Sequence, residues 1–231
     1  MALDFIQNHP FILAFLLGLI PALVWLWFWM KEDIHPEPAK MVTLSFVGGM
    51  LAVLFVLPFE QLVYTHFQGQ NTISFILWSA LEETFKFGFV YFIALRNKVI
   101  TDEPIDDIIY LIVSALGFAT AENTLFLIPS INIGDLTSTI VSGNMRFVGA
   151  SLLHIISSAT IGICMALAFY KTQTKKRLYI VVGIILAIIL HTLFNLFIMD
   201  GTYNIFFIFG IVWIGIIILL LMFEKIKILK H

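Results

Sequence analysis

The sequence has 231 residues, of which 60% are hydrophobic and 12% are charged, whereas an ordinary soluble domain has about 45–50% apolar and about 25% charged residues. So few charged residues could not cover the apolar surface of a soluble fold of this length, so the lipid bilayer is the expected solvent. The net charge of -2 gives no indication of a nucleic-acid partner, and the single cysteine, Cys164, excludes a disulfide framework and a cysteine metal cluster.

Seven apolar stretches follow one another along the chain, each about long enough to cross a bilayer as a helix. The first has no preceding Lys or Arg and ends in tryptophans, so we interpret it as a membrane span and not as a signal peptide. We therefore predict an all-α polytopic membrane helix bundle that forms a single transmembrane domain over residues 1–231. The expected spans are about residues 10–30, 41–64, 73–95, 106–129, 146–170, 178–199 and 203–223.

Basic residues alternate between the two sides of these spans. Eleven of the 13 lie in the connections after the first, third and fifth spans or in the C-terminal tail. The opposite connections contain only Arg146, and Lys86 lies within a span. Because cytoplasmic loops carry an excess of Lys and Arg, we predict that the N-terminus is outside and the C-terminus is cytoplasmic. The polar connection of about residues 130–145 would then be an outer loop.

Six titratable residues lie inside the predicted spans, where a charged group costs about 2.5–3.5 kcal/mol to insert. With a rise of about 1.5 Å per residue, the carboxylates and imidazoles lie about 10–14 Å from the outer ends of their helices. A common depth on four helices predicts one shared site in the outer half of the bilayer. The six residues are Glu82, Glu83 and Lys86 in the third span, Glu122 in the fourth, His154 in the fifth and His191 in the sixth.

Helical spacing adds partners to this layer. Lys86 is four residues after Glu82 and three after Glu83, so it can neutralise one carboxylate from the same helix face. Asn195 is four residues after His191, which places a hydrogen-bonding amide one turn away on the same face.

The charge balance of the layer has two solutions. With neutral histidines it contains three carboxylates and one ammonium, so either some carboxylates share protons or a divalent cation lies among them. Glu122, His154 and His191 form the two-His, one-carboxylate set of catalytic zinc hydrolases. In that case Glu82 or Glu83 would remain as a base beside the metal-bound water.

The same residues resemble the motifs of the PrsW family of intramembrane proteases. The segment Leu81-Glu82-Glu83-Thr84-Phe85-Lys86 is similar to its EExxK motif, and residues 118–123 are similar to its second motif, which ends in Glu-Asn. Residues 154–158 and 191–195 resemble its third and fourth motifs. The resemblance covers about residues 73–199, which would then form the catalytic core.

The resemblance implies a protease of the bacterial plasma membrane that cuts membrane-anchored proteins such as anti-sigma factors. The related CAAX-processing and bacteriocin-processing proteases are metal-independent: their first Glu and a His activate water, while His and Asn stabilise the oxyanion. By this resemblance Glu82 is the general base, Glu83 is held by Lys86, and Asn195 donates to the oxyanion. Glu122 stands where those relatives have a His, which favours a bound cation, and we expect zinc.

Two alternatives remain open on the sequence. The site could work without a metal, as in the CAAX-type enzymes. Intramembrane carboxylates and histidines also build proton or cation transporters, although the internal repeat or broken helices of a transporter are not recognisable here. Glu60 lies near the outer end of its span, where we expect an interfacial residue.

Overall fold

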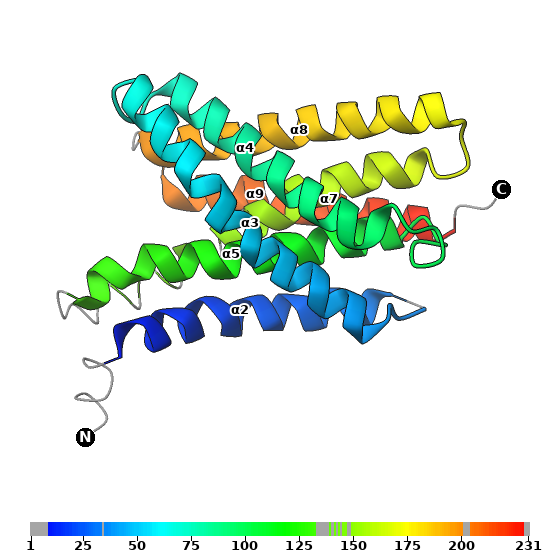
Figure 1. Ribbon diagram of the computed structural model, residues 1–231, viewed down its shortest axis with the longest axis horizontal. Helices are drawn as coiled ribbons and strands as arrows, with labels where there is room; N and C mark the ends of the chain where they lie inside the picture. The colour runs from blue at the N-terminus through cyan, green and yellow to red at the C-terminus, as the bar shows by residue number, and fades with distance from the viewer. Residues whose placement is uncertain are drawn as a thin grey trace.

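The computed structural model describes residues 9–33, 35–132, 139, 141, 143, 145, 146, 149–200 and 204–228. Within this part of the chain the regular secondary structure is entirely helical. Figure 1 shows most helices lying side by side along one long axis, with α3 and its neighbour α4 running obliquely to them.

In the described part of the chain, seven long helices correspond to the seven membrane spans predicted from the sequence. They are α2 (Pro10–Glu32), α3 (Ala39–His66), α4 (Thr72–Val90), α5 (Asp106–Asn132), α7 (Ala150–Leu167), α8 (Gln173–Asp200) and α9 (Ile205–Lys227), and α4 continues into a π-helical turn, η1 (Tyr91–Leu95). Helix α7 begins later than predicted, because Gly149 precedes its first residue as the N-cap. Helix α8 begins earlier, because its polar first turn continues the helix beyond the apolar stretch.

Six of these helices are long and apolar enough to cross a membrane. Helix α4 is the exception, because it contains Glu82, Glu83 and Lys86, and all three of these side chains are buried. The protein is therefore a polytopic helical membrane protein, as predicted. That residues 1–231 form a single domain, and that residues 73–199 form its catalytic core, remain predictions.

Successive helices run in alternating directions along the bundle (Figure 1). One end therefore contains the end of α3, the start of α4, the end of α5 and the end of α8. The opposite end contains η1, the start of α5 and the start of α8. The first end contains the candidate active site, and we call the second end the basic end because Arg96, Lys98, Lys175, Lys176 and Arg177 lie there.

Helix α5 lies at the centre of the bundle and packs against α2, α3 and α7. Its residues from Ile108 to Phe118 are all buried, as expected for a helix that is apolar on every side. Helices α3 and α5 approach closely because a glycine lies on each side of their contact. A Cβ atom on Gly117 would overlap the backbone of Phe46, and one on Gly49 would overlap the backbone of Ser114.

Candidate active site

Helix α4 contributes two adjacent carboxylates with different surroundings. Glu83 is fully buried, and its Oε1 accepts a hydrogen bond of 2.6 Å from Lys86 Nζ. Its other oxygen, Oε2, accepts a hydrogen bond of 3.1 Å from the Ser158 hydroxyl on α7. Glu83 Oε1 also lies 2.7 Å from His191 Nδ1 on α8. Glu83 is thus the shared partner that joins α4, α7 and α8, and its hydrogen-bonding capacity is used inside the protein.

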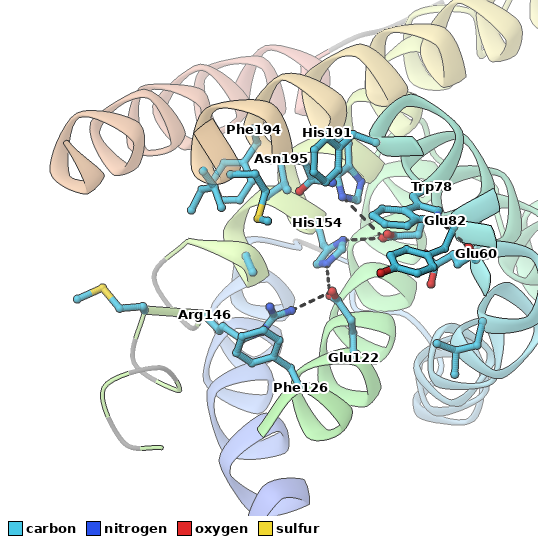
Figure 2. Close-up of a pocket in the computed structure, with 18 of the residues that line it drawn as sticks. Glu60, Trp78, Glu82, Glu122, Phe126, Arg146, His154, His191, Phe194 and Asn195 are labelled. Atoms are coloured by element: carbon cyan, nitrogen blue, oxygen red, sulfur yellow. Dashed lines mark hydrogen bonds and ion pairs between the residues drawn. The ribbon is translucent and has the colours of Figure 1, made fainter. Parts of the chain in front are cut away.

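Glu82 instead faces two imidazoles (Figure 2). Its Oε2 lies 4.0 Å from His154 Nδ1 and 3.7 Å from His191 Nε2. The other nitrogen of each ring is engaged by a carboxylate: His154 Nε2 lies 2.8 Å from Glu122 Oε2, and His191 Nδ1 bonds to Glu83. A nitrogen that bonds to an ionised carboxylate carries the proton. The two remaining nitrogens therefore carry lone pairs on the side of Glu82, and the one on His154, Nδ1, also lies 3.0 Å from Lys86 Nζ.

One oxygen of the Glu82 carboxylate forms no hydrogen bond with the described residues where it faces the two imidazoles. Glu82 Oε2 is buried and has no hydrogen-bond partner among the described residues. A buried acceptor without a partner costs about 1–3 kcal/mol, more when it is charged. The convergence of three acceptor atoms with an unused oxygen among them indicates a binding position for a proton donor or a cation.

A metal ion fits this donor set. Bonds of about 2.0–2.2 Å to nitrogen and oxygen ligands allow two ligands to lie up to about 4.2 Å apart. The distances of 4.0 and 3.7 Å from Glu82 Oε2 to the two nitrogens are within that range. Among the described residues, Glu82, His154 and His191 form a group compact enough to hold a metal ion. Imidazole and carboxylate ligands suit zinc and several other divalent transition metals.

Glu122, which the sequence predicts as a metal ligand, lies on the far side of His154 from Glu82. Its Oε2 bonds to His154, and its Oε1 pairs with Arg146 Nη2 at 2.9 Å (Figure 2). A carboxylate that accepts the second N–H of a metal-binding histidine fixes the orientation of the ring. Glu122 has that position here, and its expected role as a direct ligand stays a prediction.

Arg146 is a site residue that the sequence reasoning did not include. Besides pairing with Glu122, its guanidinium lies 4.3 Å from the Phe126 ring centroid, and its Nε donates to Asn123 Oδ1. Asn123 Nδ2 in turn donates to the Ser151 hydroxyl at 3.2 Å. The sequence did contain a signal, because Arg146 is the one basic residue in the predicted outer connections.

Glu60 of α3 is a further residue of the site, to which the sequence analysis assigned only an interfacial position. Its side chain lines the same cavity as Glu82 and interacts with that carboxylate. Its backbone carbonyl accepts a hydrogen bond of 3.0 Å from Trp78 Nε1, which connects α3 to α4. Its position could have indicated that it lines the cavity, because Glu60 is six residues from the C-terminal end of α3, a distance of about 9 Å along the helix.

These residues line a cavity of about 640 Å³ between the helices. Its polar residues are Glu60, Gln61, Glu82, Glu122, Arg146, His154, His191 and Asn195. Aromatic side chains supply much of the remaining wall, namely Tyr64, Phe75, Trp78, Phe126, Phe194 and Phe209. Asn195 is half-buried and lies near His191 (Figure 2). Apolar walls with a few convergent polar groups are typical of a ligand-binding or active-site cavity.

The charged residues near this cavity do not balance one another, and the charged residues of the basic end do not line it. Among the described residues, the charge inside the cavity and its immediate shell is unbalanced, with four carboxylates (Glu60, Glu82, Glu83 and Glu122) and two cations (Lys86 and Arg146). The excess of carboxylates is a second reason why a divalent cation fits this position.

Comparison with known proteins identifies relatives over most of the chain. Residues 37–222 match the family model described as "PrsW family intramembrane metalloprotease". Protease PrsW of Clostridioides difficile (strain 630) is 28% identical over 192 residues, which cover 80% of this chain and 79% of the relative. Protease PrsW of Geobacillus kaustophilus (strain HTA426) is 28% identical over 188 residues, covering 77% and 76% of the two chains. No solved structure gives a significant match.

Proposed function

Because the chain belongs to the PrsW family of membrane proteases, we propose that it hydrolyses a peptide bond in a membrane-anchored protein at the centre formed by Glu82, His154 and His191. The observation that carries this proposal is the convergence of three acceptor atoms with the buried Glu82 Oε2 lacking any partner among the described residues. The proposed substrate is a membrane-anchored regulator, for which the family resemblance suggests an anti-sigma factor. Family membership also favours a protease over the alternative of a transporter.

We propose a metal-dependent site in which Glu82, His154 and His191 hold the ion, and zinc remains the expected metal. When bound there, such an ion would polarise the scissile carbonyl and lower the pKa of an attacking water. Glu122 and Glu83 hold the two imidazoles in the required tautomers. This set differs from the one predicted from sequence in one member, with Glu82 in place of Glu122.

The proton of the attacking water needs a separate acceptor if Glu82 is a ligand. Glu122 has both oxygens engaged, by His154 and Arg146, and Glu83 is fully buried among its partners. Glu60 is the remaining carboxylate that lines the cavity beside Glu82. We therefore assign the role of general base to Glu60 and the role of oxyanion donor to Asn195.

One contact favours a second mechanism. Lys86 Nζ lies 3.0 Å from His154 Nδ1, the nitrogen that a metal would need. An ammonium at that position donates to the lone pair and competes with a cation. In the metal-independent alternative, Glu82 Oε2 is the base that accepts the proton of water, and Lys86 keeps His154 neutral and oriented.

Metal content and peptide cleavage, measured on the same purified samples, separate these mechanisms. We expect wild-type protein to contain one metal ion per chain and both Glu82→Gln and His191→Ala to lose it. Glu60→Gln should retain the metal and lose about 10²–10⁴-fold in rate, the usual effect of removing a positioned base.

Other results would change the role assigned to Glu82, Glu122 or Glu60. Full activity in protein shown to be metal-free by elemental analysis would establish Glu82 as the base of a metal-independent site. If Glu122→Gln lost the metal as completely as Glu82→Gln does, Glu122 would be a direct ligand. A Glu60→Gln variant that cleaves at the wild-type rate would exclude Glu60 as the base.

A further inference from the structure

A small pocket at the basic end of the bundle is lined by cations that the proposed protease mechanism does not use. It has a volume of about 190 Å³ and lies where η1, α5, α7 and α8 meet. Its lining includes Lys98 from the connection between η1 and α5, and Lys176 and Arg177 from the first turns of α8. These residues come from segments far apart in the chain and converge only in the folded protein.

The cations of this pocket are not neutralised by ion pairs. None of Lys98, Lys176 and Arg177 forms an ion pair with a carboxylate of the described chain. Two of the cations lie near the Phe169 ring, with Lys98 Nζ 5.7 Å and Lys176 Nζ 5.4 Å from its centroid. The one acidic residue in the lining, Asp107, is 2% exposed. Three positive charges against one negative charge leave the pocket attractive to an anion.

The first turn of α8 adds to this attraction. Helix α8 begins at Gln173, which lines the pocket together with Lys176 and Arg177. The first backbone N–H groups of a helix have no partner within the helix, and the helix dipole places partial positive charge there. The pocket therefore combines side-chain cations with backbone N–H donors, a combination that suits phosphate oxygens.

The position of the pocket indicates the source of the phosphate. The pocket lies at the ends of membrane-spanning helices, and Leu95, Met165 and Ile180 form an apolar wall beside the cations. Phosphate oxygens next to an apolar wall at a membrane boundary match a phospholipid, whose headgroup lies directly above its acyl chains. Basic pockets between membrane helices on the cytoplasmic side characteristically take anionic headgroups.

We propose that this pocket binds the headgroup of an anionic phospholipid, with Lys98, Lys176 and Arg177 contacting its phosphate. Phosphatidylglycerol carries one phosphate with a net negative charge and is therefore the probe of choice.

The test measures how tightly the full-length protein retains phosphatidylglycerol. Native mass spectrometry of protein in neutral detergent, titrated with phosphatidylglycerol, gives the apparent affinity of the first bound lipid. Each basic residue near an anionic surface contributes roughly a fivefold factor in affinity. The double variant Lys176→Gln/Arg177→Gln should therefore bind about 30-fold more weakly than wild type.

The matched control is Lys171→Gln/Lys175→Gln, which removes the same charge from exposed positions beside the pocket that do not line it. The proposal predicts that this control binds phosphatidylglycerol as wild type does. Equal weakening in both double variants would mean diffuse attraction to the basic end and would overturn the pocket assignment.

Two further arms use wild-type protein and do not depend on whether a variant folds. Phosphatidylcholine should fail to compete with phosphatidylglycerol, and millimolar inorganic phosphate should compete only weakly. Equal binding of the two lipids would overturn the proposal. Displacement of the lipid by inorganic phosphate at comparable concentration would assign the pocket to a free phosphate and not to a lipid headgroup.

Discussion

At the scale of single residues, a chain of polar contacts connects the mouth of the cavity to its centre. Arg146 pairs with Glu122 at 2.9 Å, and Glu122 bonds to His154 at 2.8 Å. His154 then directs its other nitrogen towards Glu82. Because each member fixes the orientation of the next, a change at Arg146 should affect chemistry at a group that it does not touch.

We predict that Arg146→Gln lowers kcat/KM about 10–100-fold, the usual effect of losing an outer partner of a catalytic histidine. The loss should be accompanied by weaker metal retention, which a purely structural role would not cause. Stability should change little, because a partly exposed ion pair contributes only about 0–1 kcal/mol. The measurements are cleavage rate, bound metal and thermal unfolding on the same preparations.

The chain offers a matched control for Arg146. Arg96 lies at the basic end, with its guanidinium 5.6 Å from the Phe92 ring centroid, so it makes a similar contact away from the cavity. Arg96→Gln should cleave at the wild-type rate. If both variants lost activity equally, or if Arg146→Gln retained full activity and metal, the positioning role of Arg146 would be wrong.

At the scale of elements, the contact between α3 and α5 determines how α5 lies in the bundle. Gly117→Ala would place a methyl group against the Phe46 backbone, which cannot move without shifting the whole of α3. Overpacking of this kind costs about 1–3 kcal/mol. We therefore predict a lower thermal unfolding midpoint for Gly117→Ala.

Gly88→Ala is the comparison for this substitution, because a Cβ atom at Gly88 has nothing within 4 Å. An alanine there should be neutral or should stabilise α4 by roughly 0.5–1 kcal/mol, the usual gain over glycine inside a helix. An unfolding midpoint that fell equally in both variants would show that the close approach of α3 and α5 does not control stability.

The connection between α2 and α3 gives a pH-dependent contribution to stability. Burial raises the pKa of Glu37 above its ordinary value, although the Tyr110 hydroxyl, which donates to Glu37 Oε2 at 2.5 Å, acts in the opposite direction. A carboxyl group with a raised pKa in the folded state stabilises the fold below its ordinary pKa. This contribution is lost as the pH rises through the raised value.

Glu37→Gln removes this titration while keeping a side chain of similar shape. Relative to the variant, wild type should therefore lose stability as the pH rises above the ordinary Glu pKa of about 4.3, as measured by thermal unfolding midpoints. Glu224→Gln, at an exposed residue near the C-terminal end, is the control and should leave the pH profile unchanged. A constant difference between wild type and Glu37→Gln across this range would contradict the prediction.

At the scale of the whole molecule, the helix ends nearest the candidate active site and the helix ends of the basic end lie at opposite ends of the bundle (Figure 1). The positive-inside rule then predicts that the cavity opens outward and the phospholipid pocket faces the cytoplasm. In a Cys164→Ser background, we expect a cysteine at Gln70 to react with an impermeant reagent in intact cells. A cysteine at Lys175 should react only after permeabilisation. The reverse pattern would move the cavity to the cytoplasmic side.

The sequence by itself determined the number of helices, their approximate bounds and the position of each titratable group along its helix. A span needs only about 20 apolar residues and a depth needs only a residue count along one helix, so both are local properties. The spacing on α4 likewise placed Lys86 within reach of both Glu82 and Glu83, and the structure pairs it with Glu83, three residues away. These features followed from the residues because they depend on one helix at a time.

The tertiary structure decided how each helix is rotated about its axis, which the depth of a residue does not fix. That rotation selected Glu82, and not Glu122, as the carboxylate facing both imidazoles, and it brought Glu60 and Arg146 to the cavity. The contacts that define the site join residues far apart in the chain, such as His191 and Glu83, which are separated by 108 positions. Such contacts depend on the packing of several helices at once, and no spacing within a single helix encodes them.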